Sequence, residues 1–298
     1  MDKWIKCIAK GGNVMATAIT AKTLIDEAQK RHALAHPTNK SHPSPVQALG
    51  ESLIAGLLLS SNCKAGERIS LSVKGEGFLK HVLVDALPDG SVRGFLISRA
   101  AEVPPVDSTL GPWQKGLLSV VRLKLGEKEP YVGTVPIVTG HLAKDLTFYL
   151  LQSEQIPAAV GLAVNFDRSG KVESAGGFLV QVVPGASKKE IARIEQNINK
   201  LQSLAREIAK NSDPTVLLGQ IFDDMTFIIL DEKPLRFECS CSKERIVRAL
   251  MLLGKDELRD MMSQDHGAKV HCDFCSKLFD ISESELDQII KQLGAKAE

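Results

Sequence analysis

The chain has 298 residues, 44% of them hydrophobic, and its 37 basic and 36 acidic side chains leave a formal net charge of +1. This length allows one large core or two to three domains. The balanced charge argues against a surface that binds nucleic acid. No apolar run is long enough to cross a bilayer and no signal peptide begins the chain, so we expect a cytoplasmic protein without membrane partners.

Strands and hairpins dominate the first part of the chain. Strands are predicted at residues 14–18, 69–73, 82–86, 92–97, 121–125, 131–138, 158–166 and 175–183. Tight turns join two pairs of them into hairpins. One helix should begin at Pro45, capped by Ser44, and another should lie around Leu142 to Leu150. Because regular alternation of strands and helices is missing, we predict an α+β core domain over residues 1–183.

The composition changes after Pro184-Gly185. Ser187 and Glu190 form a capping-box pattern, and apolar residues at helical spacing then continue to Ile208. This pattern predicts one long amphipathic helix, followed by a second that Asp213-Pro214 begins. We therefore predict an ordered helical connector over residues 184–230.

Four cysteines near the C-terminus concentrate the chemistry of the chain. Cys239 and Cys241 form one pair, Cys272 and Cys275 form the other, and 30 residues separate the pairs. Two thiol pairs brought together by a fold make the tetrahedral four-sulfur site that structural zinc prefers. The gap of one residue in the first pair is shorter than usual. Such a pair can hold metal, and it can equally form a local disulfide.

Residues 231–298 should form a small C-terminal domain around these cysteines. Its short predicted helices, capped by Ser242 and Ser282, bury too little apolar surface to be stable alone. Zinc contributes on the order of 10–16 kcal/mol to the folding of such modules, so metal loss should unfold this one. Lys243, Arg245 and Lys277 lie close in sequence and should favour the thiolate form, which oxidants attack.

The other potential ligands are expected to be structural. Cys7 and Cys63 stand in apolar surroundings and are read as packing residues. His36 and His42 lie in a proline-rich loop over residues 33–43, where solvent exposure is the simpler interpretation. His266 and His271 flank the predicted zinc site, but four cysteines already complete a coordination shell.

The cysteine motifs resemble those of the heat shock protein 33 family of redox-regulated holdase chaperones. The similar segment runs from Cys239-Ser240-Cys241 through Ser242-Lys243-Glu244-Arg245, and continues at Cys272-Asp273-Phe274-Cys275. Shorter motifs extend the resemblance over nearly the whole chain: Arg31-His32, Ala48-Leu49-Gly50, Gly75-Glu76-Gly77, Val92-Arg93-Gly94-Phe95, Tyr131-Val132-Gly133, Ser153-Glu154-Gln155-Ile156-Pro157, Ala175-Gly176-Gly177, Gln181 and Pro184-Gly185.

The resemblance implies a cofactor, a switch and a class of partner. In the reduced state Cys239, Cys241, Cys272 and Cys275 would bind one zinc ion, and the protein would be inactive. Oxidation would join Cys239 to Cys241 and Cys272 to Cys275, release the metal and unfold the C-terminal redox-switch domain. The destabilised connector would expose apolar surface, which holds unfolding client proteins without ATP. The resemblance also implies a homodimer after oxidation, no enzymatic activity and no catalytic residue.

Two apolar segments are candidates for the client-binding surface. One is the apolar seam of the connector, and the other is the run that begins at Met225 and ends at Leu230. Ordinary core packing explains either segment equally well.

Two other functions are compatible with the cysteines alone. The first is a purely structural zinc knuckle in a protein that binds nucleic acid or another partner. The second is a thiol–disulfide enzyme built on Cys272 and Cys275. Such enzymes place the motif at a helix N-terminus, whereas residues 277–281 are predicted to be extended here.

Overall fold

The structure is a computed structural model that describes residues 1–34, 45–98, 110–124, 126–127, 129–201, 203–223 and 225–295. Ser44 and most of the predicted 33–43 loop, including His36 and His42, lie outside the described residues. The chain divides into two compact units, Met1–Glu238 and Cys239–Glu298. Residues 184–230 and residues 231–238 therefore both belong to the first unit. The functional division into core, connector and switch stays a prediction.

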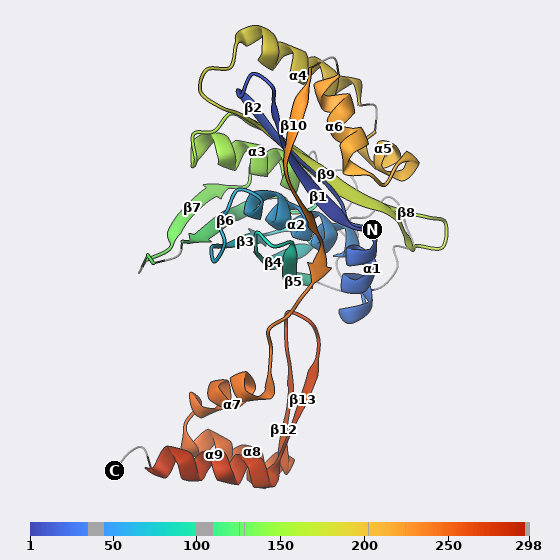
Figure 1. Cartoon of the computed structure of the whole chain (residues 1–298). Helices are drawn as coiled ribbons and strands as arrows, with labels where there is room; N and C mark the ends of the chain where they lie inside the picture. The colour runs from blue at the N-terminus through green and yellow to red at the C-terminus, as the bar shows by residue number, and fades with distance from the viewer. Residues whose placement is uncertain are drawn as a thin grey trace. The chain divides into compact units, whose positions relative to one another are not determined.

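The first unit contains two largely antiparallel sheets, with one layer of helices between them and another on the outer face of the first sheet (Figure 1). The first sheet has the strand order β10 (Phe227–Pro234), β1 (Lys3–Ala9), β2 (Val14–Thr20), β9 (Val172–Val182) and β8 (Ala158–Phe166). The second has the order β11 (Arg236–Phe237), β5 (Ser91–Ser98), β4 (Leu79–Ala86), β3 (Arg68–Gly75), β6 (Gly116–Leu123) and β7 (Tyr131–Pro136), with only β11 parallel to its neighbour. The hairpins predicted from the turns, β4–β5 and β8–β9, are confirmed.

Helix α2 (Pro45–Ser60) lies between the two sheets and contacts strands of both. Most of its side chains are buried because a helix covered on two sides must be apolar nearly all round. Gly56 permits the close approach, since a Cβ there would lie 2.7 Å from Val84 Cγ1. Helices α1 (Lys22–Arg31) and α3 (Leu142–Gln152) lie in the same layer as α2.

The predicted long connector helix is wrong in one respect, because the chain forms two helices there. Helix α4 (Lys188–Lys200) has the predicted Ser187–Glu190 capping box, and α5 (Leu204–Lys210) begins after a break at extended Leu201 and Ser203. The break turns Ile208 onto strand β9, where Gly176 leaves room for it. Tertiary packing thus overrides an apolar period that continues through the break.

Helices α4, α5 and α6 (Pro214–Phe222) cover the face of the first sheet opposite α2. Their apolar side chains pack with those of the strands in one cluster that includes Ile5, Phe178, Ile194 and Leu218. Buried Asn197 on α4 donates a hydrogen bond of 3.1 Å to the Ile221 carbonyl at the end of α6. The connector is therefore docked on the sheet in this structure.

The last strands of the first unit join both sheets. Strand β10 pairs with β1, and the next residues form β11 beside β5. Phe237 is buried there, with the Arg31 guanidinium 5.0 Å from its ring centre. Glu238 donates a backbone hydrogen bond to Val92 and directly precedes Cys239. The chain thus leaves a firmly paired segment as it enters the second unit.

The second unit contains three helices and one hairpin within its described residues. These are α7 (Lys243–Met251), α8 (Lys255–Asp265), β12 (Gly267–His271), β13 (Leu278–Ser282) and α9 (Glu283–Ala295). Ser242 caps α7 and the Ser282–Glu285 capping box begins α9, as predicted. Helix α7 stops at Met251, and Gly254 directly precedes α8.

The mixture of helices with largely antiparallel sheets confirms the α+β prediction. Among the described residues, the longest apolar helical stretches fall short of what is needed to span a bilayer.

Glu51 on α2 provides a test of the buried middle layer. This side chain is half-buried, and burial raises its pKa to about 7 although Gln47 donates a 2.9 Å hydrogen bond to it. Because the folded state holds this proton more tightly, the contribution of Glu51 to stability should be largest below pH 4.5 and should fall as the pH rises to about 7. The loss should reach at most about 1.4 kcal/mol per pH unit.

Glu51→Gln should therefore unfold at higher urea concentration than wild type at pH 8, and at a similar concentration at pH 4.5. Fluorescence of Trp4 and Trp113, both buried in the first unit, reports the transition. Midpoints whose difference does not change with pH would contradict this account.

Candidate metal centre

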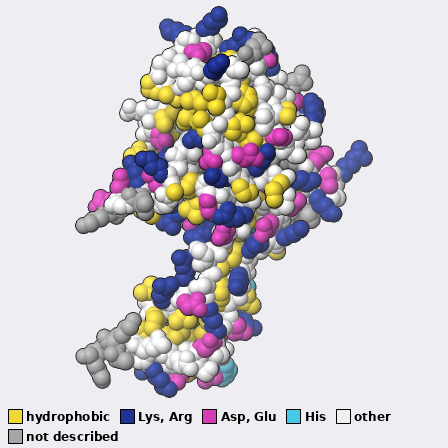
Figure 2. Space-filling view, viewed as in Figure 1, with side chains coloured by type: hydrophobic (Ala, Val, Ile, Leu, Met, Phe, Trp, Pro, Cys, Tyr) yellow, Lys and Arg dark blue, Asp and Glu magenta, His cyan; other side chains and the backbone are white. Residues whose placement is uncertain are grey.

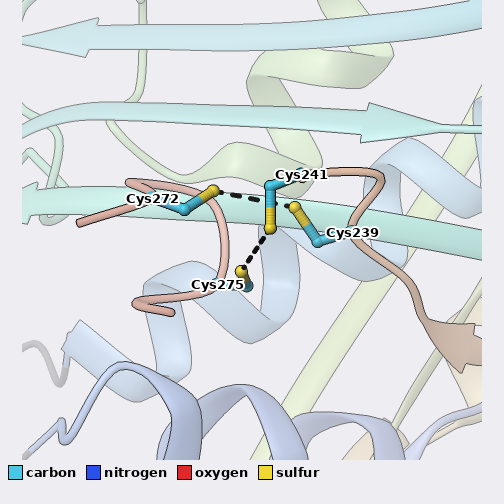
Figure 3. Close-up of side chains that lie close together, drawn as sticks. All are labelled: Cys239, Cys241, Cys272 and Cys275. Carbon is cyan, nitrogen blue, oxygen red and sulfur yellow. Dashed lines mark hydrogen bonds between the residues drawn. The ribbon is translucent and has the colours of Figure 1, made fainter. Parts of the chain in front are cut away.

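The fold brings the four predicted cysteines together in the second unit (Figure 3). Cys239 and Cys241 lie on the segment before α7, whereas Cys272 and Cys275 lie in the turn between β12 and β13. The Sγ atoms of Cys239 and Cys272 are 3.7 Å apart, and those of Cys241 and Cys275 are 3.4 Å apart. All four sulfurs lie within 4.8 Å of one another.

This spacing matches a tetrahedral thiolate site. Zinc–sulfur bonds of about 2.3 Å place the sulfurs of a regular tetrahedron about 3.8 Å apart. Sulfurs joined in a disulfide lie about 2.05 Å apart, and the four cysteines are free thiols here. The cluster has no oxygen or nitrogen donor, and an all-sulfur set of this geometry suits zinc. The four residues could therefore hold one metal ion.

Backbone amides support the first cysteine of each pair. The Cys241 amide donates to Cys239, and the Phe274 amide donates to Cys272. In the second pair, the amides of Cys275 and Ser276 also donate to the Cys272 carbonyl, which closes a tight turn with Ser276 at a φ of 57°. The first pair therefore has an amide–sulfur hydrogen bond, from Cys241 to Cys239, although only one residue separates its cysteines.

The acidities of the thiols differ because they are hydrogen-bonded to one another. Burial acts to raise the pKa of Cys239, but hydrogen bonds from the Cys241 amide and from the other thiols outweigh it and lower the pKa. Burial and the bonds to neighbouring thiols raise the pKa values of Cys241 and Cys272. Cys239 is therefore more readily ionised than Cys241 or Cys272, and a cation among the sulfurs would favour the thiolate form of all of them.

The three basic residues expected to favour the thiolates have other partners. Lys243 Nζ lies 2.6 Å from Glu285 Oε1, and Arg245 Nη1 donates a 2.7 Å hydrogen bond to Ser240 Oγ. Lys277 Nζ lies 5.1 Å from the centre of the Phe279 ring. The contact between Lys243 and Glu285 was not predicted, because no spacing in the sequence indicates that these two residues meet.

The other cysteines and histidines that the structure describes lie outside the cluster. Cys7 is buried in β1, where burial raises its pKa to about 12, in agreement with a packing role. Cys63 follows α2 and accepts a hydrogen bond of 3.5 Å from Arg122. His266 ends α8 with Nδ1 3.6 Å from Glu283, and His271 is exposed on β12. Strand β13 (Leu278–Ser282) confirms the prediction that the chain after Cys275 is extended rather than helical.

Comparison with known proteins finds one consistent set of relatives. A sequence model of the family described as "Hsp33 protein" matches residues 2–282. The "33 kDa chaperonin" of Streptococcus thermophilus is 36% identical over 293 residues, which cover 97% of this chain and 99% of the relative. The "33 kDa chaperonin" of Citrifermentans bemidjiense is 37% identical over 299 residues, with 98% of each chain covered.

The structural comparison agrees with the sequence comparison. The crystal structure of the 33 kDa chaperonin of Thermotoga maritima, a heat shock protein 33 homologue, superposes with a TM-score of 0.88. The two chains are 29% identical, and the match covers 99% of each. The fold, the clustered cysteines and these relatives together place the chain in the heat shock protein 33 family of chaperones.

Proposed function

We propose that this protein is a redox-regulated, ATP-independent holdase that prevents the aggregation of unfolding proteins. The observation that carries the proposal is the group of four free thiols within 4.8 Å of one another, in a chain of a chaperone family. A structural zinc site alone needs no chaperone context, and a chaperone without the cluster has no sensor for oxidants. The cysteine cluster and the chaperone family together support a molecule that both senses oxidants and holds unfolding proteins.

In the reduced state Cys239, Cys241, Cys272 and Cys275 hold one zinc ion as four thiolates. The bound ion supplies cross-linking energy to the second unit, on the order of 10–16 kcal/mol in comparable modules. The buried core of that unit is small and centres on Leu250, Leu258, Ile281, Leu286 and Ile289. A core of this size supplies only a few kcal/mol, so the fold depends on the thiolates.

Oxidation removes the ligands in pairs. Each disulfide forms when one hydrogen peroxide molecule takes two electrons from two thiolates and two protons from the solvent, and is reduced to two water molecules. The proposed pairs are Cys239 with Cys241 and Cys272 with Cys275. In the folded cluster, sulfur contacts of 3.7 Å and 3.4 Å instead join cysteines of different pairs, Cys239 to Cys272 and Cys241 to Cys275. Pairing of sequence neighbours therefore rearranges the cluster, which is consistent with unfolding of the second unit.

The activated protein holds clients on apolar surface. Helices α4–α6 cover an apolar face of the first sheet, and their release would expose that face to unfolding chains. A second apolar surface is exposed already. It is the segment Ile228–Leu230 of edge strand β10, whose three residues are 55%, 48% and 52% exposed. Apolar surface of this kind also supports the proposed homodimer after oxidation.

The charge distribution supports a protein partner rather than nucleic acid. On the face in Figure 2, lysine and arginine side chains are interspersed with aspartate and glutamate. The formal net charge of +1 provides no strong attraction for phosphates. A reducing, cytoplasmic location is proposed because four of the six cysteines are paired at metal-binding spacing, a pattern that fits a reducing compartment better than a disulfide scaffold.

Replacing single cluster cysteines tests the metal site. Cys239→Ser, Cys241→Ser, Cys272→Ser and Cys275→Ser should each weaken zinc binding by more than the roughly 10–100-fold that changes outside the coordination shell cause. Competition with a chelating dye measures the affinity. Cys7→Ser and Cys63→Ser are matched controls that should keep one zinc per chain. Equal affinity in a cluster variant and a control would contradict the assignment.

Replacing all four cluster cysteines tests the switch. Light scattering of a heat-denatured client, with and without peroxide, measures the holdase activity of the quadruple serine variant. We expect peroxide to make no difference to this variant, because no thiol pair remains to be oxidised. Peroxide activation of the variant would show that the sensor lies elsewhere and that the cluster is a structural knuckle.

A further inference from the structure

An ion pair joins the two ligand-bearing halves of the second unit. Lys243 lies two residues after Cys241 at the start of α7, and Glu285 lies in the first turn of α9, after the hairpin that carries Cys272 and Cys275. Lys243 Nζ is 2.6 Å from Glu285 Oε1. Both side chains are about half-exposed, at 44% and 37%.

Glu285 is held in place by its own helix. Its Oε2 atom accepts hydrogen bonds from the Ser282 amide, at 3.0 Å, and the Ser282 hydroxyl, at 3.1 Å. The Glu285 amide donates back to Ser282 Oγ, which completes the capping box. One carboxylate oxygen therefore fixes the start of α9, and the other is presented to Lys243. The hydrogen bond from Lys243, with those from Ser282, lowers the pKa of Glu285 to about 2.

Three neighbouring charged side chains make different contacts. Arg245 bonds Ser240 within the first segment, and Lys277 contacts Phe279 within the hairpin strand. Glu283, two residues before Glu285, faces His266 at the end of α8. Glu283 is thus a matched acidic side chain in the same turn of α9 without a link to the first cysteine pair.

We propose that Glu285 is a positioning residue for the metal centre: through Lys243 it holds the Cys239–Cys241 segment beside Cys272 and Cys275, which strengthens zinc binding and slows the oxidative opening of the cluster. The inference rests on the proposed zinc site and deepens it by naming what sets its affinity. The physical reason is preorganisation. Bringing together ligand pairs separated by 30 residues costs chain entropy, and a contact between the two halves that does not involve the ligands themselves reduces that cost.

The test separates the charge of Glu285 from its role as a cap. Glu285→Gln keeps an acceptor for the Ser282 amide but removes the charge, whereas Ser282→Ala removes the capping hydroxyl but keeps the charge. Lys243→Met removes the cation and Lys243→Arg retains it. The full-length protein is used throughout, and zinc dissociation constants are measured by chelator competition at low and high salt.

Glu285→Gln and Lys243→Met should each weaken zinc binding roughly two- to fivefold at low salt, the range expected for a half-exposed ion pair. Salt near 1 M should abolish the difference from wild type, because it screens exposed charges within a few ångströms. The double variant should bind no more weakly than either single one. Lys243→Arg and Glu283→Gln should match wild type, and zinc release by peroxide should accelerate only in the variants that lose the pair.

Several results would overturn the inference. One is an effect of Glu285→Gln no larger than that of Glu283→Gln. Another is an effect that persists at high salt and adds to that of Lys243→Met, which would assign Glu285 to helix capping alone. Either result leaves the proposed switch intact if wild type still releases zinc with peroxide. Failure of wild type to bind zinc would reject the proposed function itself.

Discussion

The second unit depends on what holds its four sulfurs together. Its described buried core is a small cluster around Leu258, Ile281 and Leu286, and a unit as short as Cys239–Glu298 is only marginally stable from such a core alone. Four thiols crowded within 4.8 Å cannot all ionise without a cation among them. In the proposed switch, the same four residues are both the main support of the second unit's fold and its most oxidisable groups, so that stability and sensing are one property.

The first unit has a different source of stability. Helix α2 is buried between two sheets, and α4–α6 cover the remaining face of the first sheet. This layered core does not involve the cysteine cluster. This contrast is consistent with the proposed switch, in which the second unit loses its fold while the first keeps its own. Strands β10 and β11 pair with β1 and β5, and β11 ends at Phe237, two residues before Cys239, where the second unit begins.

Local patterns in the sequence predicted most of the elements. The hairpins β4–β5 and β8–β9 were predictable because turn residues and alternating strands lie next to each other in the chain. The caps Ser187, Asp213, Ser242 and Ser282 were predictable for the same reason. The cluster of four cysteines followed from residue type and spacing.

Long-range features were not predictable in this way. Strand β1 pairs with β10 from the other end of the unit, and no local signal marks that pairing. The break between α4 and α5 arises because Ile208 packs beside Gly176, a contact that helical periodicity does not contain. The Lys243–Glu285 ion pair likewise joins residues on separate helices. Each of these depends on tertiary structure rather than on sequence neighbours.

Simultaneous measurement of bound zinc and holdase activity tests the central claim most directly. A chelating dye would follow zinc while peroxide is added at moderately raised temperature, and light scattering of a heat-denatured client would be recorded in the same samples. The account predicts that one zinc per chain is released as aggregation is suppressed, and that a reductant with added zinc reverses both changes. Zinc that stays bound, or that is released with no gain in holdase activity, would contradict it.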